Sequence, residues 1–343
     1  MGLSAAGTGG GTDLSIVTVC MNRREHLCST AKHVADWPGH QEHLIVDWSS
    51  AVPVRREQLP ADARIRLLRV EGEPSWNLCR AYNFAVARAR GNWILKLDAD
   101  AWPTQAFDPM AVVGRLFGDG QDQEGRCAFG SGLDGRKGQF LMRQRLFAAV
   151  GGFNEHLIGY GFDDKDLQAR LAVHTGQSPL SLPEAWIGVI PHSDAERASQ
   201  GRSGRFHWLE DSRGLAAMRA SRLSNRLLAA HCPWSGRAGA SSYQERSRGV
   251  WQVEPASIPR LPLAVADEIE HARRMTFWGC FLAIPDIFLE VLPFKLFPPS
   301  RKGRWDVRWW HRLYWHSGRR LLQMPVLLLA FSRGSLRGWQ RPG

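Results

Sequence analysis

Residues 93–100 (WILKLDAD) form a short apolar run that ends in two aspartates with one residue between them. Such a run predicts a buried strand, on which side chains two residues apart point to the same face. Asp98 and Asp100 are therefore expected on one side of a sheet, at its carboxyl edge, where open α/β sheets bind ligands.

Two carboxylates placed together at such an edge repel each other unless a cation or several donors compensate them. Hard oxygen ligands suit Mg²⁺ or Mn²⁺, which proteins usually share with a diphosphate. The alternative is that Asp98 caps the following turn and Asp100 is solvated. The pair alone does not decide between the two.

The segments around this run alternate between strand and helix patterns. Residues 14–20, 44–47 and 65–70 are rich in branched side chains and predict strands, whereas 24–37 and 76–90 have helical spacing. This alternation predicts an α/β fold with a mostly parallel sheet and helices on both faces. Further predicted elements are a strand at 140–142, helices at 144–150 and 164–173, and a strand at 186–190.

Composition restricts the class of protein. The 343 residues carry a net charge of +11 and have a pI of about 9.9, which favours anionic partners such as nucleoside diphosphates, acidic lipids or nucleic acid. The six cysteines have neither metal-type spacing nor the density of a secreted disulfide framework, which predicts an intracellular, cytoplasmic setting. Residues 1–12 lack the features of a signal peptide and predict a disordered lead.

A second acidic cluster occupies residues 159–167 (GYGFDDKDL). Its glycines allow the backbone to turn sharply toward a ligand, and its carboxylates would open the helix that follows. Capping of that helix by Asp163 or Asp164 is the alternative to a catalytic role. A third feature is His192, which follows a predicted strand and has Asp98 and Asp100 as candidate partners for a metal ion.

With these motifs in place, the chain resembles an inverting glycosyltransferase with the GT-A fold, in the broad family 2 group. Residues 151–154 (GGFN) and 159–166 (GYGFDDKD) are similar to the carboxyl half of β-1,4-galactosyltransferases and of bacterial chondroitin-type polymerases. The resemblance spans roughly residues 14–194. It implies a Rossmann-like GT-A sheet and a nucleotide-sugar donor, expected to be a UDP-sugar.

The resemblance implies a set of donor-binding residues. Asp47 would recognise the uracil, Asp98 would lie near the ribose, and Arg23 would lie near the uridine and diphosphate. Asp100 and His192 would hold Mn²⁺ or Mg²⁺, with Asp98 beside them. The other residues that the resemblance places near the nucleotide are Thr18, Cys20, Asn22, Arg80 and Asn83.

The acceptor side follows from the same resemblance. Asp163 and Asp164 match the acidic pair that holds the acceptor sugar, with Asp164 at the position of the general base. Tyr160 takes the place of an aromatic residue that stacks on sugars. The chain departs from the family pattern at Val189, which replaces a methionine ligand, and at Phe162 and Asp163, which replace a glycine and a glutamate. Donor and acceptor identities are therefore not carried over.

The C-terminal part has a different amino-acid composition. The apolar runs 277–284 and 324–331 are too interrupted or too short to span a bilayer. Residues 304–320 mix arginines with tryptophans, which suits a helix on an anionic membrane surface; a packed helical subdomain is the alternative. No nucleic-acid-binding module is recognisable. Residues 195–207 predict either a basic lid over the diphosphate or an ordinary solvated loop.

The predicted layout is a lead at 1–12, a GT-A domain at 13–205, a helix and linker at 206–260, and a helical, basic-aromatic region at 261–343. Within the third part, the helix covers 208–230 and the Gly/Ser/Arg-rich linker covers 235–248. The predicted function is metal-dependent transfer of a hexosyl or N-acetylhexosaminyl group to a glycan or lipid-linked acceptor, at the inner face of a membrane. The alternative is a non-catalytic membrane or nucleic-acid binding protein on a degenerate GT-A fold.

Overall fold

The computed structural model describes residues 13–108, 125–132, 135–191, 207–235 and 239–282, together with five positions between 321 and 332. The chain divides into two compact units. The first, which we call the sheet unit, holds the described residues up to Leu157, then Asp163–Pro191 and Trp234–Arg260. The second, the helical unit, holds Ile158–Phe162, the described residues of 192–233, and those after Arg260.

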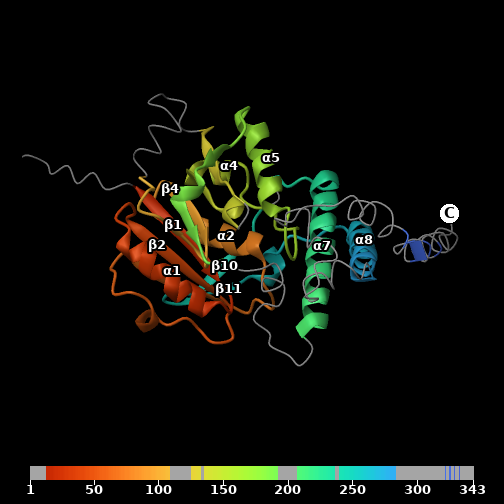
Figure 1. Cartoon of the computed structure of the whole chain (residues 1–343), viewed down its shortest axis with the longest axis horizontal. Helices are drawn as coiled ribbons and strands as arrows, with labels where there is room; N and C mark the ends of the chain where they lie inside the picture. Colours follow the sequence, from red (N-terminus) through yellow and green to blue (C-terminus); the bar gives the residue numbers. More distant parts are fainter. Residues whose placement is uncertain are drawn as a thin grey trace, which may run out of the picture. The chain divides into compact units, whose positions relative to one another are not determined.

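The main sheet of the sheet unit contains nine strands among the described residues, in the order β10-β11-β3-β2-β1-β4-β7-β6-β8 (Figure 1). Strands β1 to β4 run parallel to one another, as the alternating pattern predicted. The α/β fold with a mostly parallel sheet is therefore confirmed. These four strands are β1 (Leu14–Cys20), β2 (Glu42–Trp48), β3 (Ile65–Glu71) and β4 (Trp93–Asp98).

Helices cover both faces of this parallel region. Helix α1 (Arg24–Asp36) buries Leu27 against Ile45 on one face. Helix α2 (Leu78–Val86) lies on the other face, where the Phe84 ring meets the Trp48 ring edge-on at 6.2 Å. Because side chains alternate along a strand, β4 presents residues to α1 and to α2 in turn.

The rest of the sheet unit adds antiparallel strands beside β4. Strand β7 pairs antiparallel with β4 and with β6, whereas β5 and β9 form a separate two-stranded sheet. The two helices predicted at 144–150 and 164–173 are present, close to their predicted bounds. The elements are β5 (Ala101–Pro103), β6 (Cys127–Gly130), β7 (Phe140–Arg143), α4 (Gln144–Ala149), α5 (Asp163–Thr175), β8 (Leu180–Leu182) and β9 (Ile187–Val189).

The structure differs from the predicted linker at 235–248. Strands β10 (Tyr243–Ser247) and β11 (Val250–Val253) form a hairpin whose second strand pairs in parallel with β3 and extends the sheet. The hairpin packs through aromatic rings, since the Tyr243 ring lies 4.8 Å from the Phe84 ring. Polar composition alone suggested a linker, but the edge of a sheet tolerates such residues because one side of the strand faces water.

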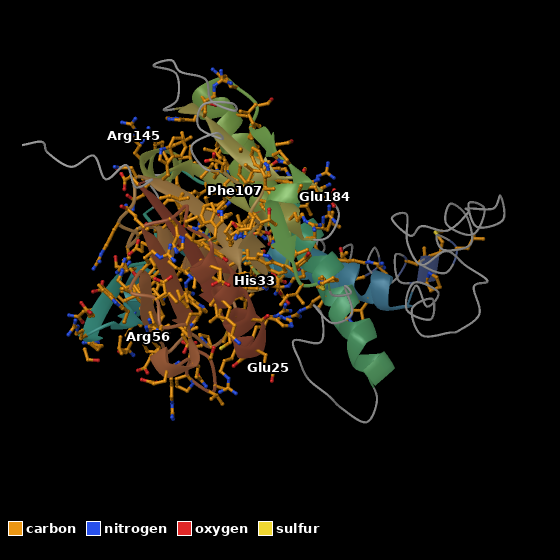
Figure 2. The ribbon with its side chains drawn as sticks, turned by 60° about the vertical axis from the view of Figure 1, so that its left-hand side comes forward. Glu25, His33, Arg56, Phe107, Arg145 and Glu184 are labelled. Carbon is orange, nitrogen blue, oxygen red and sulfur yellow. The ribbon has the colours of Figure 1, made fainter. Side chains whose placement is uncertain are left out.

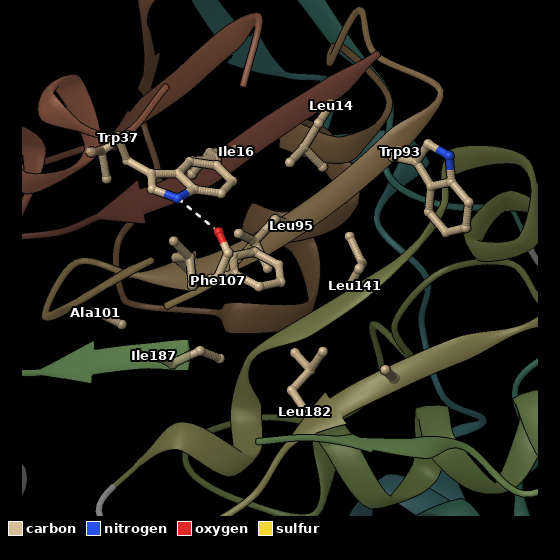
Figure 3. Packing of buried hydrophobic residues seen from close by; sticks show 13 residues of the cluster. Leu14, Ile16, Trp37, Trp93, Leu95, Ala101, Phe107, Leu141, Leu182 and Ile187 are labelled. Carbon is tan, nitrogen blue, oxygen red and sulfur yellow. Dashed lines mark hydrogen bonds between the residues drawn. The ribbon is translucent and has the colours of Figure 1, made fainter. Parts of the chain in front are cut away.

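Figure 3 shows one core cluster, on the face of β1 and β4 that carries Ile16, Leu95 and Leu97. Leu95 and Leu97 of β4 pack with Trp37, whose indole N–H donates to the Phe107 carbonyl oxygen at 3.0 Å. Full burial of each large apolar side chain contributes about 1.5–3 kcal/mol. Figure 2 shows the contrast at the surface, where Arg145 and Glu184 carry exposed charged side chains around this apolar interior.

The helical unit contains α7 (His207–His231) and α8 (Leu263–Leu282), which pack against each other. Helix α7 confirms the helix predicted at 208–230. Among the described residues, no helix is sufficiently long and apolar to cross a membrane. The predicted lead at 1–12, nearly all of the predicted lid at 195–207 and the basic-aromatic tail at 304–320 lie outside the described residues.

Candidate active site

The candidate site begins at the carboxyl ends of three adjacent parallel strands. In the register of the sheet, Cys20 of β1 is the partner of Asp47 in β2, and Val19 is the partner of Asp98 in β4. The chain leaves β1 toward β2 on one side, while β4 lies on the other side. A reversal of strand order of this kind forms a crevice in which open α/β sheets bind ligands.

Asp98 is held by three side chains. The Lys96 ammonium donates to Asp98 Oδ1 at 2.8 Å, and the Gln139 amide donates to Oδ2 at 2.8 Å while its oxygen accepts from the Asp98 N–H. The Tyr82 hydroxyl lies 3.2 Å from Oδ1 and 2.9 Å from the Leu97 carbonyl oxygen. Burial raises the pKa of Asp98, but the Lys96 ammonium outweighs it and the net pKa is lowered. Asp98 is therefore anionic at neutral pH, and its side chain remains 34% exposed.

Asp100 lies in the turn after β4, because the strand ends at Asp98, two residues before it. Its carboxylate is 3.9 Å from the Arg23 guanidinium, which the sequence predicted near the diphosphate. Its carbonyl oxygen accepts from the Ile190 N–H at 2.8 Å, so the end of β9 lies beside Asp100. His192 follows two residues after Ile190 in the sequence but lies outside the described residues.

Asp98 has a protein donor at each oxygen, and the hard carboxylate oxygens of Asp100 follow two residues later in the turn, beside Arg23. Asp100 is the position at which the resemblance placed the metal ion. Within the part of the chain that the structure describes, no three His, Cys, Asp or Glu side chains converge as a complete metal site. A cation held by Asp100 would therefore take further ligands from the donor diphosphate, from water or from His192.

The second acidic cluster opens helix α5, as predicted. Asp163 is 9% exposed, and Asp164 has an oxygen, Oδ1, that is buried without a hydrogen-bond partner among the described residues. Burial raises the pKa of Asp164 well above the usual carboxyl range, the Asp163 carboxylate raises it further, and the Lys96 ammonium opposes both. A carboxyl group with a raised pKa and a free acceptor oxygen suits a general base.

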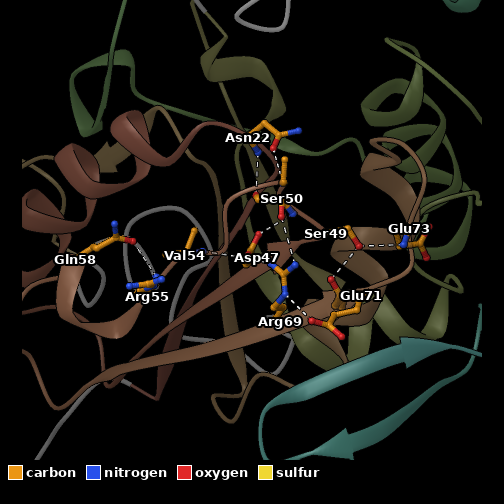
Figure 4. A network of polar contacts seen from close by, with 12 residues as sticks. Asn22, Asp47, Ser49, Ser50, Val54, Arg55, Gln58, Arg69, Glu71 and Glu73 are labelled. Carbon is orange, nitrogen blue, oxygen red and sulfur yellow. Dashed lines mark hydrogen bonds and ion pairs between the residues drawn. The ribbon is translucent and has the colours of Figure 1, made fainter.

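Asp47 is enclosed by its own loop (Figure 4). Its oxygens accept from the Ser50 N–H at 3.1 Å and the Val54 N–H at 3.0 Å, and Arg69 closes the third side at 2.5 Å. The side chain is 1% exposed. Contact between this carboxylate and a uracil, as the resemblance implied, therefore requires the loop to open.

Three residues predicted near the nucleotide lie at the end of β1 and in the loop after it: Thr18, Cys20 and Asn22. Asn22 has a left-handed backbone, with φ of 57°, and joins the loop after β2: its N–H donates to Ser50 Oγ and its side chain accepts from the Ala51 N–H. Thr18 is buried 3.1 Å from His43 Nε2, and Cys20 is buried, which raises its pKa to about 12. The side chains of Thr18 and Cys20 therefore face the protein interior in this structure.

Arg80 and Asn83 face the protein in this structure. Arg80 forms an ion pair with Glu73. The Asn83 side chain accepts from the Phe153 N–H at 2.7 Å and donates to the Phe153 carbonyl and to Glu155. It thereby holds the turn at Gly152, where a Cβ would clash with Asn83 Oδ1 at 2.3 Å. Both residues are placed to support the fold around the site, and the nucleotide contacts that the resemblance implied remain predictions.

Tyr160 belongs to the helical unit, where α7 fixes its loop. The Tyr160 N–H donates to Ser221 Oγ at 3.0 Å, and the Asn225 amide donates to the carbonyl oxygens of Ile158 and Gly161. The Tyr160 side chain is 45% exposed, as a sugar-stacking ring must be.

Sequence reasoning missed Lys96, Gln139 and Gly138. Lys96 has no exposed surface, and its ammonium also donates to the Gly138 carbonyl oxygen at 2.7 Å. A signal was present, since a lysine inside a predicted buried strand needs a compensating partner, and Asp98 stands two residues later on the same face. No comparable signal existed for Gln139, whose position depends on the pairing of β7 with β4.

Two family models match the chain. Residues 15–113 match glycosyl transferase family 2, and residues 131–188 match the N-terminal domain of galactosyltransferase. The chain carries a glycosyl transferase family 2 domain. These two stretches are similar to glycosyltransferases, and the predicted resemblance is confirmed. No curated protein matches the sequence significantly.

Three solved structures illustrate the similarity of this chain to known folds. Glucosyl-3-phosphoglycerate synthase from Mycobacterium tuberculosis, with Mn²⁺, UDP and phosphoglyceric acid, is 17% identical, with 75% of this chain and 92% of that chain covered and a TM-score of 0.47. A mannosyltransferase from Pyrobaculum calidifontis with GDP-Man and Mn²⁺ is 12% identical (94% and 87% covered, TM-score 0.42). The catalytic domain of Drosophila β1,4-galactosyltransferase 7 with xylobiose is 11% identical (75% and 98% covered, TM-score 0.43).

Proposed function

We propose that the chain is an inverting, metal-dependent glycosyltransferase that moves a hexosyl or N-acetylhexosaminyl group from a UDP-sugar to a glycan or lipid-linked acceptor. The observation that carries the proposal is the pair Asp98 and Asp100 at the carboxyl edge between β1 and β4, within the family 2 domain. Anionic Asp98 suits a hydrogen bond from a ribose hydroxyl, and Arg23 suits the diphosphate.

The chemistry follows from the roles of these side chains. Asp164 takes the proton of an acceptor hydroxyl, whose oxygen attacks the anomeric carbon of the donor sugar. The bond from that carbon to the diphosphate oxygen breaks on the opposite face, and the nucleoside diphosphate leaves with the bonding electrons. In-line displacement inverts the anomeric configuration. A divalent cation at Asp100 would neutralise the charge of the leaving group.

The acceptor is proposed to lie against Asp163, with its reacting hydroxyl at Asp164. Asp164 Oδ1 supports this role because it is an acceptor without a hydrogen-bond partner in the described structure. A hydroxyl that donates to this oxygen would satisfy it and would be placed for proton transfer.

The tail is proposed to hold the enzyme on an anionic membrane surface, which would bring a lipid-linked acceptor to the site. The proposal rests on the arginines and tryptophans of residues 304–320. Salt-sensitive co-sedimentation with acidic liposomes is expected for the full chain and is expected to be absent after truncation before Leu261. Equal binding by both chains, or by neither, would contradict it.

A panel of nucleotide sugars tests the main proposal. The wild-type chain with Mn²⁺ is expected to release UDP from at least one UDP-sugar, and chelation of the metal is expected to abolish the release. Asp100→Ala should lose the metal dependence together with activity. If no donor in the panel is turned over while the folded chain binds acidic liposomes or RNA, the non-catalytic alternative is supported and the enzyme proposal fails.

A further inference from the structure

Lys96 is a charged side chain in the middle of the central strand β4, and it has no exposed surface. Its ammonium lies 2.8 Å from Asp98 Oδ1 and 2.7 Å from the Gly138 carbonyl oxygen, with the Tyr82 ring centroid at 4.6 Å. Leu95 and Leu97, its neighbours on the strand, belong to the apolar core. Lys96 is thus the only residue of β4, as described, that carries a cation onto the face occupied by Asp98.

The same ammonium reaches the acceptor side of the site through Gly138. A Cβ built at Gly138 would lie 3.5 Å from Lys96 Nζ and 3.2 Å from Asp164 Oδ2. Glycine at this position therefore leaves the space in which the ammonium and the Asp164 carboxylate approach each other. Lys96 faces two carboxylates, Asp98 on its own strand and Asp164 at the start of α5.

Stability does not explain a cation at this position. Removing an ammonium from water is costly, and exchange of a buried ion pair for apolar side chains of similar volume is often neutral or stabilising. A leucine or methionine would suit the buried middle of β4. A cation there does what an apolar side chain cannot do, because its charge attracts both Asp98, in direct contact, and Asp164, on the other side of Gly138.

We propose that Lys96 is a positioning residue of glycosyl transfer, which fixes the donor-side carboxylate Asp98 and the acceptor-side carboxylate Asp164 relative to each other across the Gly138 backbone. This inference deepens the proposed function and rests on it for the roles of Asp98 and Asp164. The ammonium has no exposed surface, so it acts through these two carboxylates and not by contact with substrate. A misplaced base or donor group costs rate even when the substrate still binds.

Lys96→Met keeps the length of the side chain and removes its charge. The expected result is a fall of about 100-fold in kcat per UDP-binding site, with a change of at most about threefold in the donor KM. Calorimetric titration with UDP and Mn²⁺ gives the concentration of folded, UDP-binding protein. Because kcat is calculated from this concentration, a partial loss of folded protein does not change it.

Arg66→Met is the matched control. Arg66 forms a 2.8 Å ion pair with Glu42 at the opposite, amino end of the strands, and its loss should lower the melting temperature but leave kcat per site within about twofold. Equal kcat values for Lys96→Met and Arg66→Met would overturn the inference. A crystal structure of Lys96→Met gives a second readout that needs no turnover.

In that structure, the Asp98 and Asp164 carboxylates are expected to move apart from their present positions around Gly138. Unchanged positions of both carboxylates would overturn the inference, whether or not the wild type is active. An inactive wild type with displaced carboxylates in the variant would instead contradict the proposed function and leave the positioning role standing.

Discussion

Asp47 and Asp98 end the two strands that flank β1, and each is paired with one cation, but the two pairs are arranged in opposite ways. The Asp47 side chain is 1% exposed, and its partner Arg69 is 22% exposed. For Asp98 the order is reversed, since the carboxylate is 34% exposed and Lys96 is fully buried.

The reversal separates a structural carboxylate from one that is available to a ligand. At Asp47 the cation covers the carboxylate from the solvent side, and two backbone N–H groups complete its hydrogen bonds. At Asp98 the Lys96 cation lies on the buried side of the carboxylate, so the negative charge is stabilised while part of the carboxylate stays exposed to solvent. Position at the carboxyl edge of the sheet is therefore not sufficient for a binding role; the side on which the counter-charge lies also matters.

The largest effect is expected for a substitution of Asp164, on the side of the site that is proposed to meet the substrates. Asp164→Asn keeps the shape of the side chain but cannot accept a proton, so kcat should fall by at least about 100-fold while donor affinity is retained. Steady-state transfer and calorimetric UDP binding measure the two quantities. Transfer within about threefold of wild type would remove Asp164 from the role of base.

A substitution of the enclosed Asp47 should lower the stability of the fold. Asp47→Asn removes the buried one of the two carboxylates that pair with Arg69, Glu71 being the other, and weakens the loop that closes on Ser50 and Val54. It should cost about 3 kcal/mol of unfolding free energy but leave transfer per UDP-binding site nearly unchanged.

Asp98→Asn leaves the fully buried Lys96 ammonium without its ion-pair partner, so it should also cost about 3 kcal/mol of unfolding free energy, and it should lower transfer. Urea denaturation measures the stability of both variants, and steady-state kinetics measures transfer. Equal transfer per UDP-binding site by the two variants would break the comparison.

The dependence on pH should report the raised pKa of Asp164. The base works when ionised, so kcat should fall about tenfold per pH unit as the pH drops through a value well above the usual carboxyl range. In the folded state the proton is bound more tightly than in the unfolded chain. The contribution of Asp164 to stability is therefore present at low pH and lost as the pH rises through the raised pKa. An acid limb near pH 4 would contradict the assignment.

A smaller effect is expected at Gly138. In Gly138→Ala the new methyl group would press on Asp164 Oδ2 at 3.2 Å, and transfer should fall about tenfold through displacement of the base. Gly125→Ala is the control, because a Cβ there meets only ordinary contacts with Thr175 at 3.6 Å. Similar activity of the two variants would show that the space at Gly138 is not needed.

The sequence predicted those features that depend on local pattern. Strands β1 to β4, helices α1 and α5, and the carboxyl-edge position of Asp98 followed from periodicity and from the alternation of elements. The hairpin β10–β11 did not, because its place in the sheet depends on contacts with β3 and Phe84, far away in the sequence.

Local sequence pattern also could not predict whether each carboxylate is enclosed or exposed. Asp47 and Asp98 look alike in the sequence, as aspartates that end apolar strands. Arg69 comes to Asp47 from β3, and Gln139 comes to Asp98 from just before β7. Only the three-dimensional pairing decides which of the two is enclosed.

The central claim is that the donor diphosphate binds at the end of β4 and not at the enclosed Asp47. Thermal unfolding of wild type, Asp100→Ala and Asp47→Asn, each with and without UDP and Mn²⁺, tests it most directly. At about 100 times the dissociation constant, the ligand should stabilise the wild type by about 2.7 kcal/mol, or roughly 5–10 °C. The account predicts the same shift for Asp47→Asn from its lower starting temperature, and no shift for Asp100→Ala. A full shift for Asp100→Ala, or a shift lost only in Asp47→Asn, would contradict it.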